Sequence, residues 1–138
     1  MNKPQINDVF KHDFSFTDEE ILMYAKISGD VNPIHVSESY SKETFYGRCI
    51  VHGYYSISVF SKVYGTLLYP ESHILISQNA NYIKPIFTGV EYTAIFTVKE
   101  IYPDKNRVLY LNEIIEKETG ELKVTGEALL MNRKSYNW

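Results

Sequence analysis

Cysteine is nearly absent from this sequence, since Cys49 is the only one among 138 residues. No disulfide can form within the chain, and a cysteine-rich metal site is excluded. No apolar run approaches the roughly 20 residues that a membrane-spanning helix needs. The residues from Met1 to Lys11 are mixed polar and lack the apolar core of a signal peptide. We therefore expect a soluble, cytoplasmic protein with no membrane partner.

Neither sign of charge is in large excess, because the chain has 14 basic and 17 acidic residues and a net charge of −3. Such a balance gives no electrostatic reason to expect a nucleic-acid partner. The hydrophobic share of 44% and the charged share of 22% are ordinary for a globular protein. A chain of this length fits one domain, which we expect to span residues 1–138.

Motifs for phosphate, metal or nucleophilic-serine chemistry are also missing. Gly47, Gly53 and Gly65 do not have the spacing of a phosphate-binding loop. The four histidines, at positions 12, 35, 52 and 73, are scattered and lack the paired spacing of metal ligands. No serine lies in the pattern of a sharp turn that presents a nucleophile. The sequence therefore predicts no metal site and no bound cofactor.

What is present begins with a helix whose two ends are both marked. Thr17 can cap the helix, and Glu20 can return a bond to the amide of the capping residue. Phe16 and Ile21 flank this capping box at the positions of a hydrophobic staple. Gly29 predicts the helix end, because glycine readily adopts the left-handed conformation that follows a last turn.

Three further segments precede the strands. Residues 31–36 are expected to be non-helical, because Pro33 favours an extended backbone at the residue before it. A short helix capped by Ser37 is expected to end at Gly47. Residues 53–68 are then predicted to form one long helix, apolar on most sides and so largely buried, that ends at residues 69–72.

The remainder of the chain has the alternation and the turns of β-structure. Strands are predicted at residues 8–16, 73–82, 91–98, 107–116 and 122–132. Strands that follow one another through turns favour antiparallel pairing, and their position after one buried helix favours a sheet wrapped around it. We therefore predict an α+β fold in which an antiparallel β-sheet surrounds a long central α-helix.

Two polar residues in the segment after the first helix are the candidates for chemistry. Asp30 and His35 lie five residues apart across a segment held by Pro33, so a carboxylate and an imidazole can converge on one water molecule. Such a pair can act as general base and general acid. Asn32 can hold the segment through bonds to its own backbone. Simple turn chemistry is the alternative, and spacing alone favours it.

The start of the long helix offers a partner for this pair. The first amides of a helix have no intrahelical acceptor and can hold an oxygen on which negative charge develops. Glycine at position 53 would let a substrate approach the backbone closely, with His52 just before it. Ser61 lies eight residues on, about two turns away, and could offer a hydroxyl to the substrate.

Specific motifs surround these candidates: Tyr24-Ala25-Lys26-Ile27-Ser28-Gly29-Asp30-Val31-Asn32-Pro33-Ile34-His35 and Ile50-Val51-His52-Gly53. They closely resemble the MaoC-like (R)-specific enoyl-CoA hydratases, and the resemblance continues through residues 82–89 and 124–128. It implies a hot-dog fold and a hydro-lyase that adds water to trans-2-enoyl-CoA, reversibly giving (R)-3-hydroxyacyl-CoA. It also implies a homodimer.

The resemblance assigns a role to each candidate. Asp30 and His35 would form the catalytic dyad, and the Gly53 amide would bind the thioester oxygen. Ser61, Asn32 and His52 would contribute to substrate binding. Coenzyme A, or an acyl-carrier protein, would belong to the substrate and not to the enzyme as a cofactor. Two alternatives stay open from the sequence: an acyl-CoA thioesterase and a non-catalytic acyl-thioester-binding subunit.

Overall fold

A computed structural model of the protein describes residues 3–68, 73–134, 136 and 138. Its sheet has six strands in the order β1-β4-β5-β6-β2, and β3 pairs with β6 beside this path. All pairs are antiparallel, as predicted. The strands are β1 (Val9–Phe14), β2 (His73–Gln78), β3 (Asn81–Tyr82), β4 (Tyr92–Tyr102), β5 (Arg107–Glu116) and β6 (Leu122–Asn132).

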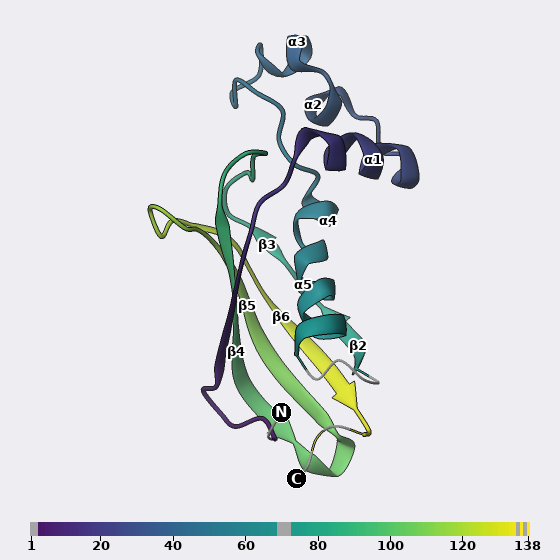
Figure 1. The fold of residues 1–138 in the computed structure, drawn as a ribbon, viewed down its shortest axis with the longest axis vertical. Coiled ribbons are helices and arrows are strands. Elements are labelled where there is room, and N and C mark those ends of the chain that lie inside the picture. The colour runs from purple at the N-terminus through teal and green to yellow at the C-terminus, as the bar shows by residue number, and fades with distance from the viewer. Residues whose placement is uncertain (1–2, 69–72, 135, 137) are drawn as a thin grey trace.

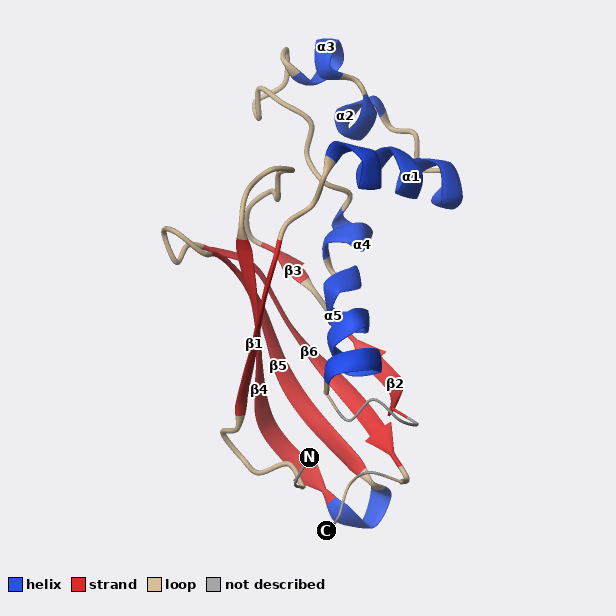
Figure 2. Ribbon diagram, in the orientation of Figure 1, coloured by secondary structure: helices blue, strands red, loops and turns tan. Residues whose placement is uncertain are grey.

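Helical segments lie along one face of the sheet and beyond one end of it (Figure 1). Along the face run α4 (Gly53–Ser56), α5 (Ser58–Lys62) and the π-helical turn η1 (Val63–Leu67). Beyond the end lie α1 (Asp18–Ser28), α2 (Pro33–Val36) and α3 (Glu38–Ser41). A 3-10 turn, η2 (Pro103–Lys105), joins β4 to β5. Figure 2 shows the curved sheet and the helices beside it, which confirms the α+β arrangement predicted from the sequence.

The core lies between the sheet and the inward side of α5 and η1. Phe60 packs edge-on against Phe96 of β4 at 5.5 Å between ring centroids. Tyr64 packs against Tyr110 of β5 at 5.3 Å. Because the sheet covers only one side of the helix, Tyr54 on the outer side is 80% exposed. The prediction of a largely buried helix is therefore wrong for its outer side.

The predicted single helix over residues 53–68 is also broken in two places. The Gly53 carbonyl accepts hydrogen bonds from the Ser56 hydroxyl at 2.6 Å and the Tyr82 hydroxyl at 2.9 Å. The backbone N–H of Ile57 bonds to the Tyr55 carbonyl, so the i→i−4 pattern stops there. Farther on, the N–H of Leu68 bonds to the Val63 carbonyl, five residues back. The helix end predicted at residues 69–72 lies outside the described residues.

The first helix has the predicted ends. Thr17 accepts a bond from the Glu20 amide at 3.2 Å, and Gly29 has a φ of +80°. Phe16 and Ile21 are both buried, as a hydrophobic staple requires. The Glu20 carboxylate bonds to the Tyr55 hydroxyl at 3.0 Å, which ties α1 to α4. The predicted return bond to the capping residue is replaced by this contact between helices.

The segment from 31 to 36 is not wholly non-helical, which corrects the prediction. Pro33 is the first residue of the one-turn helix α2, where a missing N–H costs nothing. Asn32 caps this turn by accepting a bond from the Ile34 amide at 3.2 Å. Ser37 then caps α3 through the Tyr40 amide, as predicted, but α3 ends at Ser41 and not at Gly47.

The predicted strand over residues 73–82 is split into β2 and β3. Between them, the Asn79 amide donates to the Glu127 carbonyl, the Glu127 amide donates to the Asn79 side-chain Oδ1, and Asn79 crosses over Gly126. A Cβ at Gly126 would lie 2.1 Å from the Asn79 carbonyl oxygen, so only glycine admits this crossing. Strands β5 and β6 have the predicted bounds. Among the described residues, no helix is long and apolar enough to cross a membrane.

Candidate active site

Five of the six candidate residues, all except Ser61, belong to the segments around α1, α2 and the start of α4, toward the end of the sheet where these helices lie (Figure 1). Asp30 directly follows the glycine that ends α1, and His35 lies in α2. His52 and Gly53 form the N-terminal end of α4. Residues up to 23 positions apart in the chain therefore converge at one place, as the sequence motifs indicated.

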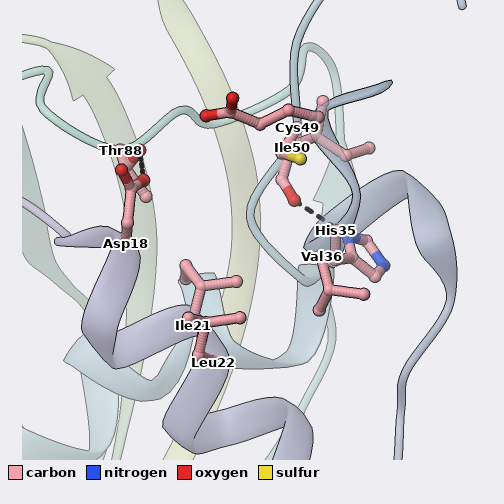
Figure 3. A pocket seen from close by; sticks show the side chains of 9 residues that line it. Asp18, Ile21, Leu22, His35, Val36, Cys49, Ile50 and Thr88 are labelled. Atoms are coloured by element: carbon pink, nitrogen blue, oxygen red, sulfur yellow. Dashed lines mark hydrogen bonds between the residues drawn. The ribbon is translucent and has the colours of Figure 1, made fainter. Parts of the chain in front are cut away.

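The His35 ring is held in one tautomer by the chain segment before α4. Its Nδ1 lies 2.8 Å from the Ile50 carbonyl oxygen, and Figure 3 shows this bond. A carbonyl oxygen only accepts hydrogen bonds, so Nδ1 carries the hydrogen and donates it. The lone pair of His35 is therefore on Nε2, which is the nitrogen left to accept a proton.

The Asp30 carboxylate is held by local backbone contacts. Its Oδ1 accepts a bond from the Asn32 amide at 3.2 Å, and the Asp30 amide donates to the Ser28 hydroxyl at 3.1 Å. Asp30 is exposed and keeps acceptor capacity beyond this one bond. Asn32 holds the segment as predicted, since it caps α2.

His52 contacts both Asp30 and His35 and is only 1% exposed. Its Nε2 lies 3.0 Å from the backbone carbonyl oxygen of Asp30, to which it donates. Its ring stacks on the His35 ring with 4.0 Å between centroids and 29° between planes. The predicted direct contact of His52 with substrate is not supported by this burial, because its ring is covered by the protein.

Within the described residues, one group of potential metal ligands gathers, made up of Asp30, His35 and His52. One ligating atom from each lies within 4.8 Å of the others, which corrects the view of these histidines as scattered. The His35 Nδ1–H and the His52 Nε2–H both donate to backbone carbonyls, so each neutral ring keeps one nitrogen lone pair. The group therefore combines a carboxylate with two imidazoles, which are residue types that acid–base chemistry uses.

A cavity of about 220 Å³ adjoins His35. His35 and Gly53 both line it, together with Ser56 and Tyr82. A Cβ at Gly53 would lie 3.2 Å from the Tyr82 ring, so the glycine leaves the helix start open to the cavity. The predicted partnership between His35 and the helix-start glycine thus has a shared space in which a small group can bind.

A second cavity, of about 140 Å³, lies on another side of His35. Its lining includes Asp18, Ile21, Cys49 and Thr88, whose side chains Figure 3 shows around the space beside His35. Asp18 accepts a bond from the Thr88 hydroxyl at 2.5 Å and joins α1 to the segment before β4. The imidazole of His35 therefore stands in the wall between two cavities.

Ser61 does not lie with the other candidate residues. It lies in α5, is exposed, and does not line the cavity shared by His35 and Gly53. Ser56 does line that cavity and bonds to the Gly53 carbonyl. Residues three positions apart share a helix face, so this spacing could have indicated Ser56 from the sequence.

Tyr82 was not identified from the sequence as a site residue. Burial raises the pKa of its hydroxyl, with smaller contributions from Tyr54 and Tyr24, so the hydroxyl stays protonated and donates to Gly53. Its place over the helix start depends on the pairing of β3 with β6. No local pattern in the sequence signals that pairing.

Comparison with known proteins gives a family match over most of the chain. A family model described as "MaoC like domain" matches residues 2–118. An (R)-specific enoyl-CoA hydratase of Aeromonas caviae is 34% identical over 111 residues, which are 80% of this chain and 82% of that protein. An (R)-specific enoyl-CoA hydratase of Rhodospirillum rubrum is 31% identical over 117 residues, or 85% of this chain and 80% of that protein.

A solved structure shares the fold as well. The (R)-hydratase from A. caviae involved in PHA biosynthesis superimposes with a TM-score of 0.88 at 29% sequence identity. The match covers 94% of this chain and 97% of the other. The hot-dog arrangement expected from the sequence motifs is thereby confirmed.

Proposed function

The chain belongs to the MaoC-like domain family and is a hydro-lyase, and we propose that it is an (R)-specific enoyl-CoA hydratase. In the proposed reaction it adds water to trans-2-enoyl-CoA and gives (R)-3-hydroxyacyl-CoA. The same site would catalyse the reverse dehydration. Coenzyme A, or an acyl-carrier protein, would be part of the substrate, so the proposal includes no separate cofactor.

One observation carries this proposal above the others. A carboxylate oxygen of Asp30 and a ring nitrogen of His35 lie within 4.8 Å of each other. His35 also shares a cavity with Gly53, the residue that begins α4. A carboxylate close to an imidazole, and a helix-start amide on the cavity beside that imidazole, are the groups that a hydration at a thioester needs. The two relatives named above carry the same activity in their names.

Hydrogen-bond directions favour the capture of one water molecule by the dyad. Nε2 of His35 carries a lone pair, because Nδ1 donates to Ile50, and an ionised Asp30 carboxylate is an acceptor only. A water between them would donate one hydrogen to each group and keep its oxygen lone pairs for attack. The pair would then take a proton from this water as it reacts.

The proposed addition balances within the site. The water oxygen bonds to C3, and the electrons of the C2–C3 double bond shift toward the thioester oxygen and form an enolate. The proton that the dyad has taken up is then delivered to C2 on the same face. Hydration is complete when the enolate returns to a thioester.

Gly53 is proposed to stabilise the enolate. As the first residue of α4 its N–H has no intrahelical acceptor, and it can donate to the thioester oxygen as negative charge develops there. Ser56 and Tyr82 both bond to the Gly53 carbonyl and hold this residue in place. The proposed contribution of Ser61 requires a substrate that reaches the exposed side of α5.

A homodimer is proposed from the edges of the sheet. Strand β2 ends the sheet path and exposes three consecutive apolar residues, Ile74, Leu75 and Ile76. An exposed apolar edge strand is a template for pairing with another chain. Pairing of two β2 strands would extend the sheet across two copies and would also cover these side chains.

An assay with crotonyl-CoA tests the proposed reaction. Loss of the enoyl absorbance without release of free thiol supports the hydratase. Release of thiol would instead indicate a thioesterase, and binding without either change would indicate a non-catalytic subunit. Either of these two results overturns the proposal.

Two substitutions test the assignment of the dyad. Asp30→Asn and His35→Ala should each lower kcat by at least about 100-fold, because each removes a proton-transfer group. Asp104→Asn, which changes an exposed carboxylate in η2, is the matched control and should keep the full rate. Circular dichroism and thermal melts of each variant show that the fold is kept. A rate near that of the unmodified protein in either dyad variant would exclude that residue from catalysis.

A further inference from the structure

An unbroken column of aromatic rings runs from β1 to the dyad. Neighbouring ring centroids along it are separated by 5.2, 5.1, 4.9, 4.7 and 4.0 Å. The rings, in order, are Phe14, Phe16, Tyr55, Tyr24, His52 and His35. Each pair in this column is in packing contact, so the position of the last ring depends on the ring before it. That ring is His52.

His52 touches both members of the proposed dyad without facing the cavity. One face of its imidazole stacks on His35, and its Nε2–H donates to the Asp30 carbonyl at 3.0 Å. Tyr24 packs edge-on against it at 4.7 Å. Because His52 is 1% exposed and does not line the cavity beside Gly53, its ring is not open to a substrate in that cavity.

The chemistry of this buried ring shows what the imidazole adds. Among the described residues, its Nδ1 has no hydrogen-bond partner, and a buried polar atom left unpaired lowers stability. A phenyl ring at this position would pack in the same column and leave no nitrogen unpaired. The gain that only an imidazole brings is the bond from Nε2 to the Asp30 backbone.

We infer that His52 is a positioning residue that holds Asp30 and His35 at their mutual distance, an inference that rests on the proposed function. The bond to the Asp30 carbonyl places the carboxylate, and the stacking contact sets the plane of the His35 ring. His35 has a second anchor in the Ile50 carbonyl, whereas the other hydrogen bonds described for Asp30 are local to residues 28–32. Loss of the bond should therefore affect the dyad more than loss of the stacking.

Two substitutions separate these contacts. His52→Phe keeps a ring that can stack on His35 but removes the donor to Asp30. His52→Gln keeps an N–H at about the position of Nε2 but removes the ring. Val59→Ala is the control for lost stability, because it shortens a buried side chain of α5 that is outside the proposed site.

Kinetics with crotonyl-CoA give the first readout. His52→Phe should lower kcat about 10- to 100-fold, since a misplaced catalytic group costs rate even when substrate still binds. KM should stay within about twofold, because the cavity lining is unchanged. His52→Gln should restore most of the rate, and Val59→Ala should lower Tm while keeping kcat. An unchanged kcat in His52→Phe, or a loss confined to KM, overturns the inference.

A coupled pair of variants tests the route through Asp30. In Asp30→Glu the longer side chain displaces the carboxylate by one methylene. The carboxylate is then misplaced even when His52 holds the backbone of residue 30 correctly, so the bond from His52 no longer decides the rate. Adding His52→Phe to this variant should then cost less than about threefold, because contacting residues that act as a unit are not additive. A full additive loss would show that His52 acts independently of Asp30.

Nitrogen NMR of the histidine rings gives a readout that does not depend on activity. The chain has four histidines, and single substitutions assign their signals. We expect the Nε2–H tautomer for His52 and the Nδ1–H tautomer for His35. If the protein fails to hydrate crotonyl-CoA but shows these tautomers, the proposed function is wrong, whereas the bond from His52 to the Asp30 carbonyl is confirmed. An Nδ1–H tautomer at His52 overturns the inference whatever the activity.

Discussion

At the scale of single residues, the space available at the proposed site depends on how closely the Tyr82 ring approaches Gly53. The carbonyl of this glycine accepts two hydroxyl donors, and its missing side chain leaves room for the Tyr82 ring. A Cβ there would meet that ring at 3.2 Å, a distance at which the ring must move. Glycine is therefore needed for space beside the proposed thioester position, and its backbone N–H is the proposed donor to the thioester oxygen.

Gly53→Ala should lower kcat/KM for crotonyl-CoA about tenfold, because the displaced Tyr82 ring narrows the cavity while the amide itself remains. The same change in a Tyr82→Leu background should cost less than about threefold, since a leucine leaves more room. Gly65→Ala, where a Cβ would meet nothing within 4 Å, is the control and should keep the rate. Equal losses in both backgrounds would contradict the steric explanation.

At the scale of elements, the crossing of Asn79 over β6, between β2 and β3, decides where Tyr82 lies in the lining of the cavity. Asn79 passes directly over Gly126 and bonds to Glu127 through both its backbone and its side chain. After this crossing the chain places Tyr82 at the start of α4, where its hydroxyl donates to the Gly53 carbonyl. A structural change in β6 should therefore shift β3 and, through Tyr82, alter the cavity beside Gly53.

Gly126→Ala should lower the free energy of unfolding by about 1–3 kcal/mol, because the new methyl group collides with backbone that cannot rotate away. Urea denaturation followed by circular dichroism measures this loss. Gly65→Ala again serves as control and should change the free energy of unfolding by less than about 1 kcal/mol. A variant at Gly126 as stable as that control would show that the two strands are not held at this crossing.

At the scale of the whole molecule, the two edges of the sheet differ in chemistry. The exposed positions of β1 alternate as Val9, Lys11 and Asp13, and charged residues on an edge strand discourage pairing with another sheet. The exposed residues of β2 from 74 to 76 are all apolar, with 49%, 54% and 41% of their surfaces accessible. The β2 edge is therefore the one suited to a second copy.

A double substitution, Ile74→Lys with Ile76→Lys, should convert the proposed dimer to a monomer, because two facing strands would each carry added positive charge. Light scattering after gel filtration gives the mass. Val9→Lys on the other edge is the matched control and should leave the dimer intact. A monomeric unmodified protein, or a double variant that still dimerises, would contradict the proposed interface.

Much of the fold could be predicted because it depends on local physics. The cap at Thr17 and the stop at Gly29 concern atoms a few residues apart, and both are present as predicted. Strands β5 and β6 have the predicted bounds, since alternation and turns mark them directly. The resemblance of the motifs around Asp30 and Gly53 gave the family, which the matched residues 2–118 confirm.

By itself, the sequence determined the order of elements, the antiparallel sheet and the convergence of two motifs at a helix start. Tertiary structure alone decided the breaks in the helix, the selection of Ser56 over Ser61 beside the cavity, and the stacking of His52 on His35. The reason is physical: these features depend on contacts between segments distant in the chain, such as Tyr82 against Gly53. Local patterns carry no information on which distant hydroxyl or ring will complete a bond.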